Sequence, residues 1–174
     1  LLHQLVQKTD RYQLDESDIS LISTASALHD IGKIMIPEEI LNKPGRLTEE
    51  EYAAIKTHTT EGARILKGLA IGQDEPLVKV AHAICRWHHE RWDGGGYPDR
   101  LKGDEIPIAA QVVALADVYD ALTSERCYKQ SYSHEKAVDM ILHGECGSFN
   151  PLLMECLKES SELLRTELQR SEYD

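Results

Sequence analysis

The sequence lacks the features that mark several common classes of protein. Its four cysteines form no Cys-x-x-Cys pair, so we expect reduced thiols, with neither a disulfide framework nor a sulfur-ligated zinc. Positive charge is also scarce: 19 Lys and Arg against 30 Asp and Glu give a net charge of −11. Because phosphate backbones and anionic membranes select basic surfaces, this charge argues against binding to polymeric nucleic acid or to a membrane.

Long apolar runs and strand patterns are missing too. No apolar segment is long enough to span a bilayer, and the N-terminus has no secretory signal. No stretch alternates apolar and polar residues for long enough to predict a sheet. The 174 residues, 41% of them hydrophobic, suffice for one core. We therefore expect a single cytoplasmic, soluble, all-α domain over residues 1–174. Leu1–Val6 reads as the continuation of a helix, so we expect a C-terminal fragment of a longer protein.

Capping signals predict where the helices begin. Asp15–Asp18 offers N-caps for a helix that runs into His29-Asp30 and ends at Gly32. Thr48 and Glu51 form a capping box that opens one helix reaching about Lys67, with His58 at its middle.

Proline and serine mark the remaining helix starts. Pro76 begins a helix that runs into Trp87-His88, and residues 94–103 must be irregular. Further helices are expected after Pro107, from Ser133 to Leu142, and from Pro151 toward the C-terminus.

Side chains with nitrogen or oxygen donors recur along these helices. Taken singly, most have an ordinary structural explanation: His58 as a core histidine, or Asp117, inside an apolar helix, as half of a salt bridge. Together they make a set of six donors without a thiolate, which suits iron, manganese, zinc or nickel. Six donors exceed one tetrahedral zinc, and two metals are usual for phosphoester cleavage. The six are His29, Asp30, His58, His88, His89 and Asp117.

Cationic residues near these donors offer partners for phosphate. Lys33 follows Asp30 by three residues, while Arg126 and Lys129 follow Asp117 by nine and twelve. Each alone is typical of a solvated surface charge, but their repeated proximity to metal candidates favours an anionic ligand.

The ordered motifs resemble the HD-GYP family, the bacterial HD-domain phosphohydrolases that act on cyclic di-GMP. The resemblance covers roughly residues 21–157. The motifs that carry it are His29-Asp30-Ile31-Gly32-Lys33, Ile36-Pro37, Lys43-Pro44-Gly45, Lys56-Thr57-His58, His88-His89-Glu90, Asp93-Gly94-Gly95-Gly96-Tyr97-Pro98, Ala116 to Thr123, and Arg126-Cys127-Tyr128-Lys129.

The resemblance implies roles for these residues. The fold is a compact multi-helix HD domain. The six donors hold two, or three, divalent ions, most often iron or manganese, with Asp30 bridging. Asp30 and Lys33 act in catalysis, and Glu90 orients a ligating histidine. The residues implied to bind the dinucleotide are Lys33, Tyr97, Arg126 and Lys129. The residues implied to shape the site and to dock a signalling partner are Gly94, Gly95, Gly96, Tyr97 and Pro98.

The function that follows is metal-dependent hydrolysis of cyclic di-GMP to pGpG or GMP, with water attacking phosphorus in line. An upstream regulatory domain and a homodimer are further expectations. Two alternatives stay open: an HD phosphohydrolase for another nucleotide, which would not need the Gly-Tyr-Pro segment, and a non-catalytic binding or docking module, which would not need intact ligands.

Two departures from the family pattern stand out. The family has a further metal-binding histidine on a helix upstream of His29, but only Leu1–Leu28 precede His29 here. We therefore expect the N-terminal helix to be cut short and one metal to lack a ligand. Cys127 stands where the family usually has proline.

Overall fold

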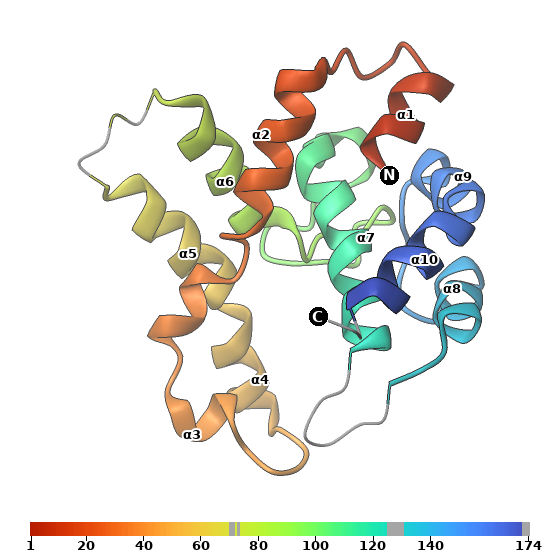
Figure 1. Cartoon of the computed structure of the whole chain (residues 1–174). Helices are drawn as coiled ribbons and strands as arrows, with labels where there is room; N and C mark the ends of the chain where they lie inside the picture. Colours follow the sequence, from red (N-terminus) through yellow and green to blue (C-terminus); the bar gives the residue numbers. More distant parts are fainter. Residues whose placement is uncertain (70–71, 73, 125–130, 172–174) are drawn as a thin grey trace. The chain divides into compact units, whose positions relative to one another are not determined.

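The computed structural model describes residues 1–69, 72, 74–124 and 131–171, which form helices and no strand (Figure 1). This confirms the predicted all-α class. The elements are α1 (Leu2–Lys8), α2 (Glu16–Ser26), the 3-10 helix η1 (Ile31–Met35), α3 (Glu38–Leu41), α4 (Glu49–Lys56), α5 (His58–Lys67), α6 (Pro76–Trp87), the 3-10 helix η2 (Gly103–Glu105), α7 (Ile108–Thr123), α8 (His134–Leu142), α9 (Pro151–Glu159) and α10 (Ser161–Ser171).

The chain divides into two compact units. One is Leu14–Ala114, and the other joins Leu1–Gln13 to Leu115–Asp174, so the boundary falls within α7. All but three of the predicted site residues belong to the first unit. The expectations of a single domain and of a longer parent protein stay predictions.

The unit Leu14–Ala114 is built on α5, which packs against α6 and η1, and α2 also packs against α6. The α5–η1 contact depends on Gly32. A Cβ atom there would lie 1.9 Å from the backbone oxygen of His58 and 2.5 Å from the nitrogen of Gly62, and no side chain fits in that space. Glycine is thus required where the His-Asp segment meets the helix that carries His58. The buried apolar residues around this contact are Ile19, Ile22, Ala25, Ala63, Leu66, Ala81 and Ile84.

The helix that begins after Asp15 starts as predicted but ends early. Asp15 and Asp18 form a reciprocal capping box. The helix stops at Ser26, and a turn carries the chain through His29 and Asp30 into η1, so the prediction of a helix reaching Asp30 was wrong. Near this end Ser26 Oγ donates to the Ser23 carbonyl, and the Nδ1 of His29 bonds the Ser26 carbonyl at 2.8 Å. Side chains that occupy backbone carbonyls compete with the helix ladder.

The helix predicted from Thr48 to Lys67 is two helices. The Thr48–Glu51 capping box is present, but α4 ends at Lys56 and α5 begins at His58. Four consecutive side chains at this junction bond to backbone carbonyls three residues earlier, which draws those oxygens away from regular helix pairing. They are Thr57 to Ala54, His58 to Ile55, Thr59 to Lys56 and Thr60 to Thr57. His58 is consequently the first residue of α5 and does not lie mid-helix.

The second unit contains α1 and α8 to α10. Ser133 caps α8 and Pro151 opens α9, as predicted. The last helix is interrupted at Ser160, however, so α9 and α10 replace the single helix expected. The buried core of this unit includes Leu5, Ile141, Leu153 and Leu157. No helix in the described ranges has the combination of length and apolar character that a membrane crossing requires.

Candidate metal centre

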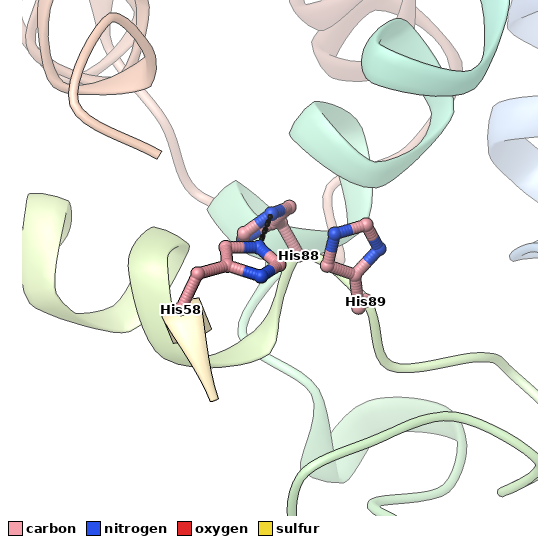
Figure 2. A group of neighbouring side chains, drawn as sticks. All are labelled: His58, His88 and His89. Carbon is pink, nitrogen blue, oxygen red and sulfur yellow. Dashed lines mark hydrogen bonds between the residues drawn. The ribbon is translucent and has the colours of Figure 1, made fainter. Parts of the chain in front are cut away.

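Three imidazoles meet where α5 begins and α6 ends. Each of His58, His88 and His89 offers a nitrogen, and these atoms all lie within 4.8 Å of one another (Figure 2). His58 comes from the first turn of α5, His88 caps α6, and His89 follows it. His58 and His88 are buried and His89 is half-buried. Sequence positions 30 residues apart thus converge on one point.

Backbone carbonyls fix the direction of two of these rings. The Nδ1 of His58 lies 2.7 Å from the Ile55 oxygen, and the Nδ1 of His88 lies 2.9 Å from the Ile84 oxygen. A carbonyl only accepts, so both Nδ1 atoms carry hydrogen and both Nε2 atoms of the neutral rings expose lone pairs. These two Nε2 atoms are 3.4 Å apart. Two lone pairs facing each other at that distance need a cation between or beside them, so the donor set fits a metal ion.

Asp30 adds a carboxylate to the same point. Its Oδ1 lies 3.4 Å from the Nε2 of His58, and its Oδ2 lies 3.3 Å from the Nε2 of His29. Each oxygen faces a different imidazole, an arrangement that suits a carboxylate shared by two ions. The ammonium of Lys33 pairs with the same Oδ2.

Burial sets the protonation of the cluster. It lowers the pKa of His58, and it lowers the pKa of His88 to about 4. Burial opposes ionisation of Asp30, but hydrogen bonds from His29 and Lys33 outweigh it and hold the pKa of that carboxyl below its usual range. At neutral pH His58 and His88 are therefore neutral imidazoles and Asp30 is a carboxylate, the forms that bind metals.

A buried cysteine, three residues before His88 on α6, does not belong to this site. Burial raises the pKa of Cys85 to about 12, and its Sγ donates to the carbonyl of Leu28 at 3.0 Å. The thiol is turned to that carbonyl and is not among the donors that converge on the site. The described donors are nitrogen and oxygen, as the sequence predicts.

The glycine-rich loop is held by carboxylates. Glu90 is 2% exposed, and its two oxygens accept from the backbone N–H groups of Asp99 at 2.7 Å and Leu101 at 3.1 Å. The carboxylate of Asp99 in turn accepts two bonds from Arg86 and one from the indole of Trp87. The Glu90 carboxylate thus bonds the loop backbone, and its predicted role in orienting a ligating histidine stays a prediction.

The returning loop also places Tyr97. A Cβ atom on Gly96 would lie 2.4 Å from the backbone of Glu90 and Arg91, so only glycine lets the loop pass this close. The ring of Tyr97 stacks on His89, with centroids 4.8 Å apart and planes 21° apart. The Tyr97–Pro98 peptide is cis. The predicted substrate contact thus touches a predicted metal ligand.

Three further predicted site residues belong to the second unit or fall outside the described residues. Asp117 lies on α7 in the second unit, so its approach to the histidines stays a prediction. Arg126 and Lys129, with Cys127, fall outside the described residues.

A hollow of about 700 Å³ opens beside Tyr97, between the α4–α5 junction and the glycine-rich loop. Three of its lining residues, Tyr52, Lys56 and Arg100, are not among the site residues predicted from the sequence. For Lys56 the available signal was its place in the family motif Lys56-Thr57-His58.

Comparison with known proteins agrees with this geometry. A family model described as HD domain matches residues 3–149. A Vibrio cholerae protein named probable cyclic di-GMP phosphodiesterase is 43% identical over 89% of this chain and 36% of its own length. A Thermotoga maritima cyclic di-GMP phosphodiesterase is 43% identical over 92% of this chain and 42% of its own length.

A third relative has a different substrate in its name. The Vibrio cholerae 3′3′-cGAMP-specific phosphodiesterase 2 is 43% identical over 85% of this chain and 28% of its own length. The chain therefore spans less than half the length of each of these relatives. The family match, the relatives and the ordered His-Asp, His-His and Gly-Tyr-Pro motifs agree: the chain belongs to the HD-domain family, in its HD-GYP branch.

Proposed function

We propose that this domain is a metal-dependent phosphodiesterase that hydrolyses cyclic di-GMP to pGpG or GMP in bacterial signalling. The observation that carries the proposal is the pair of Nε2 lone pairs 3.4 Å apart beside the carboxylate of Asp30. The names of the relatives support the substrate.

The chain's own residues would divide the work. His58 and His88, fixed by backbone carbonyls, hold two ligand atoms in place without reorganisation. Asp30 would help to hold the metal ions, and Lys33, which pairs with Asp30, would place a cation next to the phosphoryl oxygens. Tyr97 supplies a flat surface for a base. Bound divalent ions would supply an activated water and neutralise negative charge on the phosphoryl oxygens.

We propose two such ions, iron or manganese in preference to zinc or nickel, as the resemblance to the HD-GYP family implies. The donor set of imidazole and carboxylate suits all four metals. The ligands of the second ion would be His29 and, as predicted from the sequence, Asp117.

Asp30→Ala tests the function. We expect loss of bound metal and a fall in cyclic di-GMP turnover of about a thousandfold or more, with helical content unchanged by circular dichroism. The matched control is Asp139→Ala, because Asp139 also faces a histidine, His143, at 3.0 Å, but on an exposed surface. Hydrolysis that persists in Asp30→Ala at the wild-type rate would refute the assignment.

A second substrate has a specific observation in its favour. The relative named for 3′3′-cGAMP is as similar to this chain as the two named for cyclic di-GMP. Wild-type kcat/KM for both dinucleotides, measured in one competition assay, decides between them.

A further inference from the structure

The hollow beside Tyr97 has two walls, one formed by helices and the other by a loop. Tyr52 and Lys56 line it from α4, Thr57 and Thr60 from the junction with α5, and the opposite wall is the loop from Gly94 to Arg100. Tyr52 is half exposed, and its ring is thus available to a ligand. Tyr97 belongs both to this hollow and to the histidine cluster, because it stacks on His89. A molecule held at the cluster can therefore extend into the hollow across Tyr97.

Two cations border this hollow. The ammonium of Lys56 lies 5.0 Å from the ring centre of Tyr52 and 5.8 Å from that of Tyr97. Within the described residues neither Lys56 nor Arg100 forms an ion pair, whereas Lys43 and Lys79 each pair with a carboxylate. In a chain of net charge −11, two cations kept away from carboxylates at one aromatic hollow point to an electron-rich ligand.

The backbone at Arg100 is strained, and this strain supports the binding of a ligand in the hollow. Arg100 has φ of 58°, in the left-handed region that favours glycine. Its neighbours Asp99 and Leu101 are both held by the buried carboxylate of Glu90, which fixes the strained turn from both sides. Strain maintained by surrounding bonds is typical of ligand-binding segments.

We propose that this hollow is a guanine subsite that takes one base of the cyclic dinucleotide. The inference rests on the proposed function and adds the residues that read the base. The rings of Tyr52 and Tyr97 stack on the base, while Lys56 donates to O6 of guanine and Arg100 to N7. Adenine presents an amino donor in place of O6, so Lys56 disfavours it, whereas N7 accepts in both bases. Stacking does not distinguish the two bases.

Binding to metal-free protein tests the subsite without turnover. Cyclic di-GMP and cyclic di-AMP, which differ only in their bases, are titrated calorimetrically. Lys56→Met should weaken cyclic di-GMP binding about tenfold and should not weaken cyclic di-AMP binding, because adenine has no acceptor in place of O6. Tyr52→Ala should weaken both about tenfold, because stacking serves either base. Lys79→Met, which removes the same charge from a lysine paired with Asp74, should change neither.

Each other result has a definite meaning. Equal weakening of both dinucleotides in Lys56→Met would show that the lysine meets phosphate and would overturn the guanine subsite, as would no change at all. Wild-type protein that binds neither dinucleotide without metal also overturns it, since Tyr52, Lys56 and Arg100 need no metal. Guanine-selective binding in a protein that, loaded with metal, hydrolyses nothing would keep the subsite and sink the proposed function.

Discussion

The histidine cluster and the glycine-rich loop adjoin one another and are built in opposite ways. In the cluster the backbone holds side chains: carbonyls of Ile55 and Ile84 orient His58 and His88. In the loop side chains hold the backbone: Glu90 binds the N–H groups of Asp99 and Leu101. The cluster depends on helix packing, whereas the loop depends on a few charged acceptors. Substitutions in the cluster should therefore have different measurable effects from substitutions in the loop.

The largest effect is expected from Gly32→Ala. Its Cβ atom would lie 1.9 Å from the carbonyl oxygen of His58, and backbone on both sides leaves no room to shift. We expect a loss of stability of about 3 kcal/mol or more, measured by urea unfolding, together with loss of metal binding.

Gly68→Ala is the matched control for that change. At Gly68 an added Cβ would meet its nearest atoms at 3.5 Å, an ordinary contact, so stability should change by only about 0.5 kcal/mol. A Gly32→Ala protein as stable and as metal-loaded as wild type would remove the basis for calling the cluster packing-dependent.

A smaller effect is expected when the metal-free protein is acidified. Burial lowers the pKa of His88 to about 4 in the folded state, against about 6.5 in the unfolded chain. The unfolded state then binds more protons between these values, so stability is complete above pH 6.5 and is lost as pH falls toward 4. The loss amounts to about 3 kcal/mol at most, and less at pH 4.5. The pKa of His58 is lowered for the same reason and adds in the same direction.

Urea unfolding at pH 7 and pH 4.5 measures this loss. The difference between the two pH values should shrink in His88→Gln, which does not titrate, and should stay as in wild type in the exposed variant His143→Gln. Equal pH dependence in wild type and His88→Gln would show that His88 is not held neutral by burial.

The smallest effect is expected in the loop, from Glu90→Gln. An amide keeps one acceptor oxygen, so one of the two N–H groups loses its partner, at a cost of about 1–2 kcal/mol. Metal content should stay as in wild type while KM for cyclic di-GMP rises. Glu61→Gln, whose glutamate pairs with Arg64 on an exposed face, serves as the control. A loss of bound metal in Glu90→Gln would show that the histidine cluster depends on the glycine-rich loop.

Local sequence signals predicted where the helices begin but not where they break. Caps at Asp15, Thr48 and Ser133 and prolines at 76 and 151 mark helix starts because one side chain satisfies nearby N–H groups or fits the first turn. The breaks at Thr57 and after Ser26 escaped prediction. They arise from several hydroxyl and imidazole groups that bond carbonyls together, and no single residue among them forbids a helix.

The candidate site shows the same division. Residue chemistry and the family motifs named His29, Asp30, His58, His88 and His89, which the structure brings together. The roles of Glu90 and Lys56 depend on how the loop folds back on α4 and α6, and that path is set by contacts distant in sequence. Ordinary charged residues gain such roles only in three dimensions.

Because Tyr97 stacks on His89, binding of a metal at His89 and binding of a base at Tyr97 should affect each other. A metal that fixes the His89 ring restricts Tyr97 before any base arrives, which removes part of the ordering cost of base binding. Binding free energies are reciprocal, so a base resting on Tyr97 must tighten the hold of His89 on the metal by the same factor. On the proposed function, bound dinucleotide would help the domain to retain its metal, and a cell poor in dinucleotide would leave the domain more open to losing it.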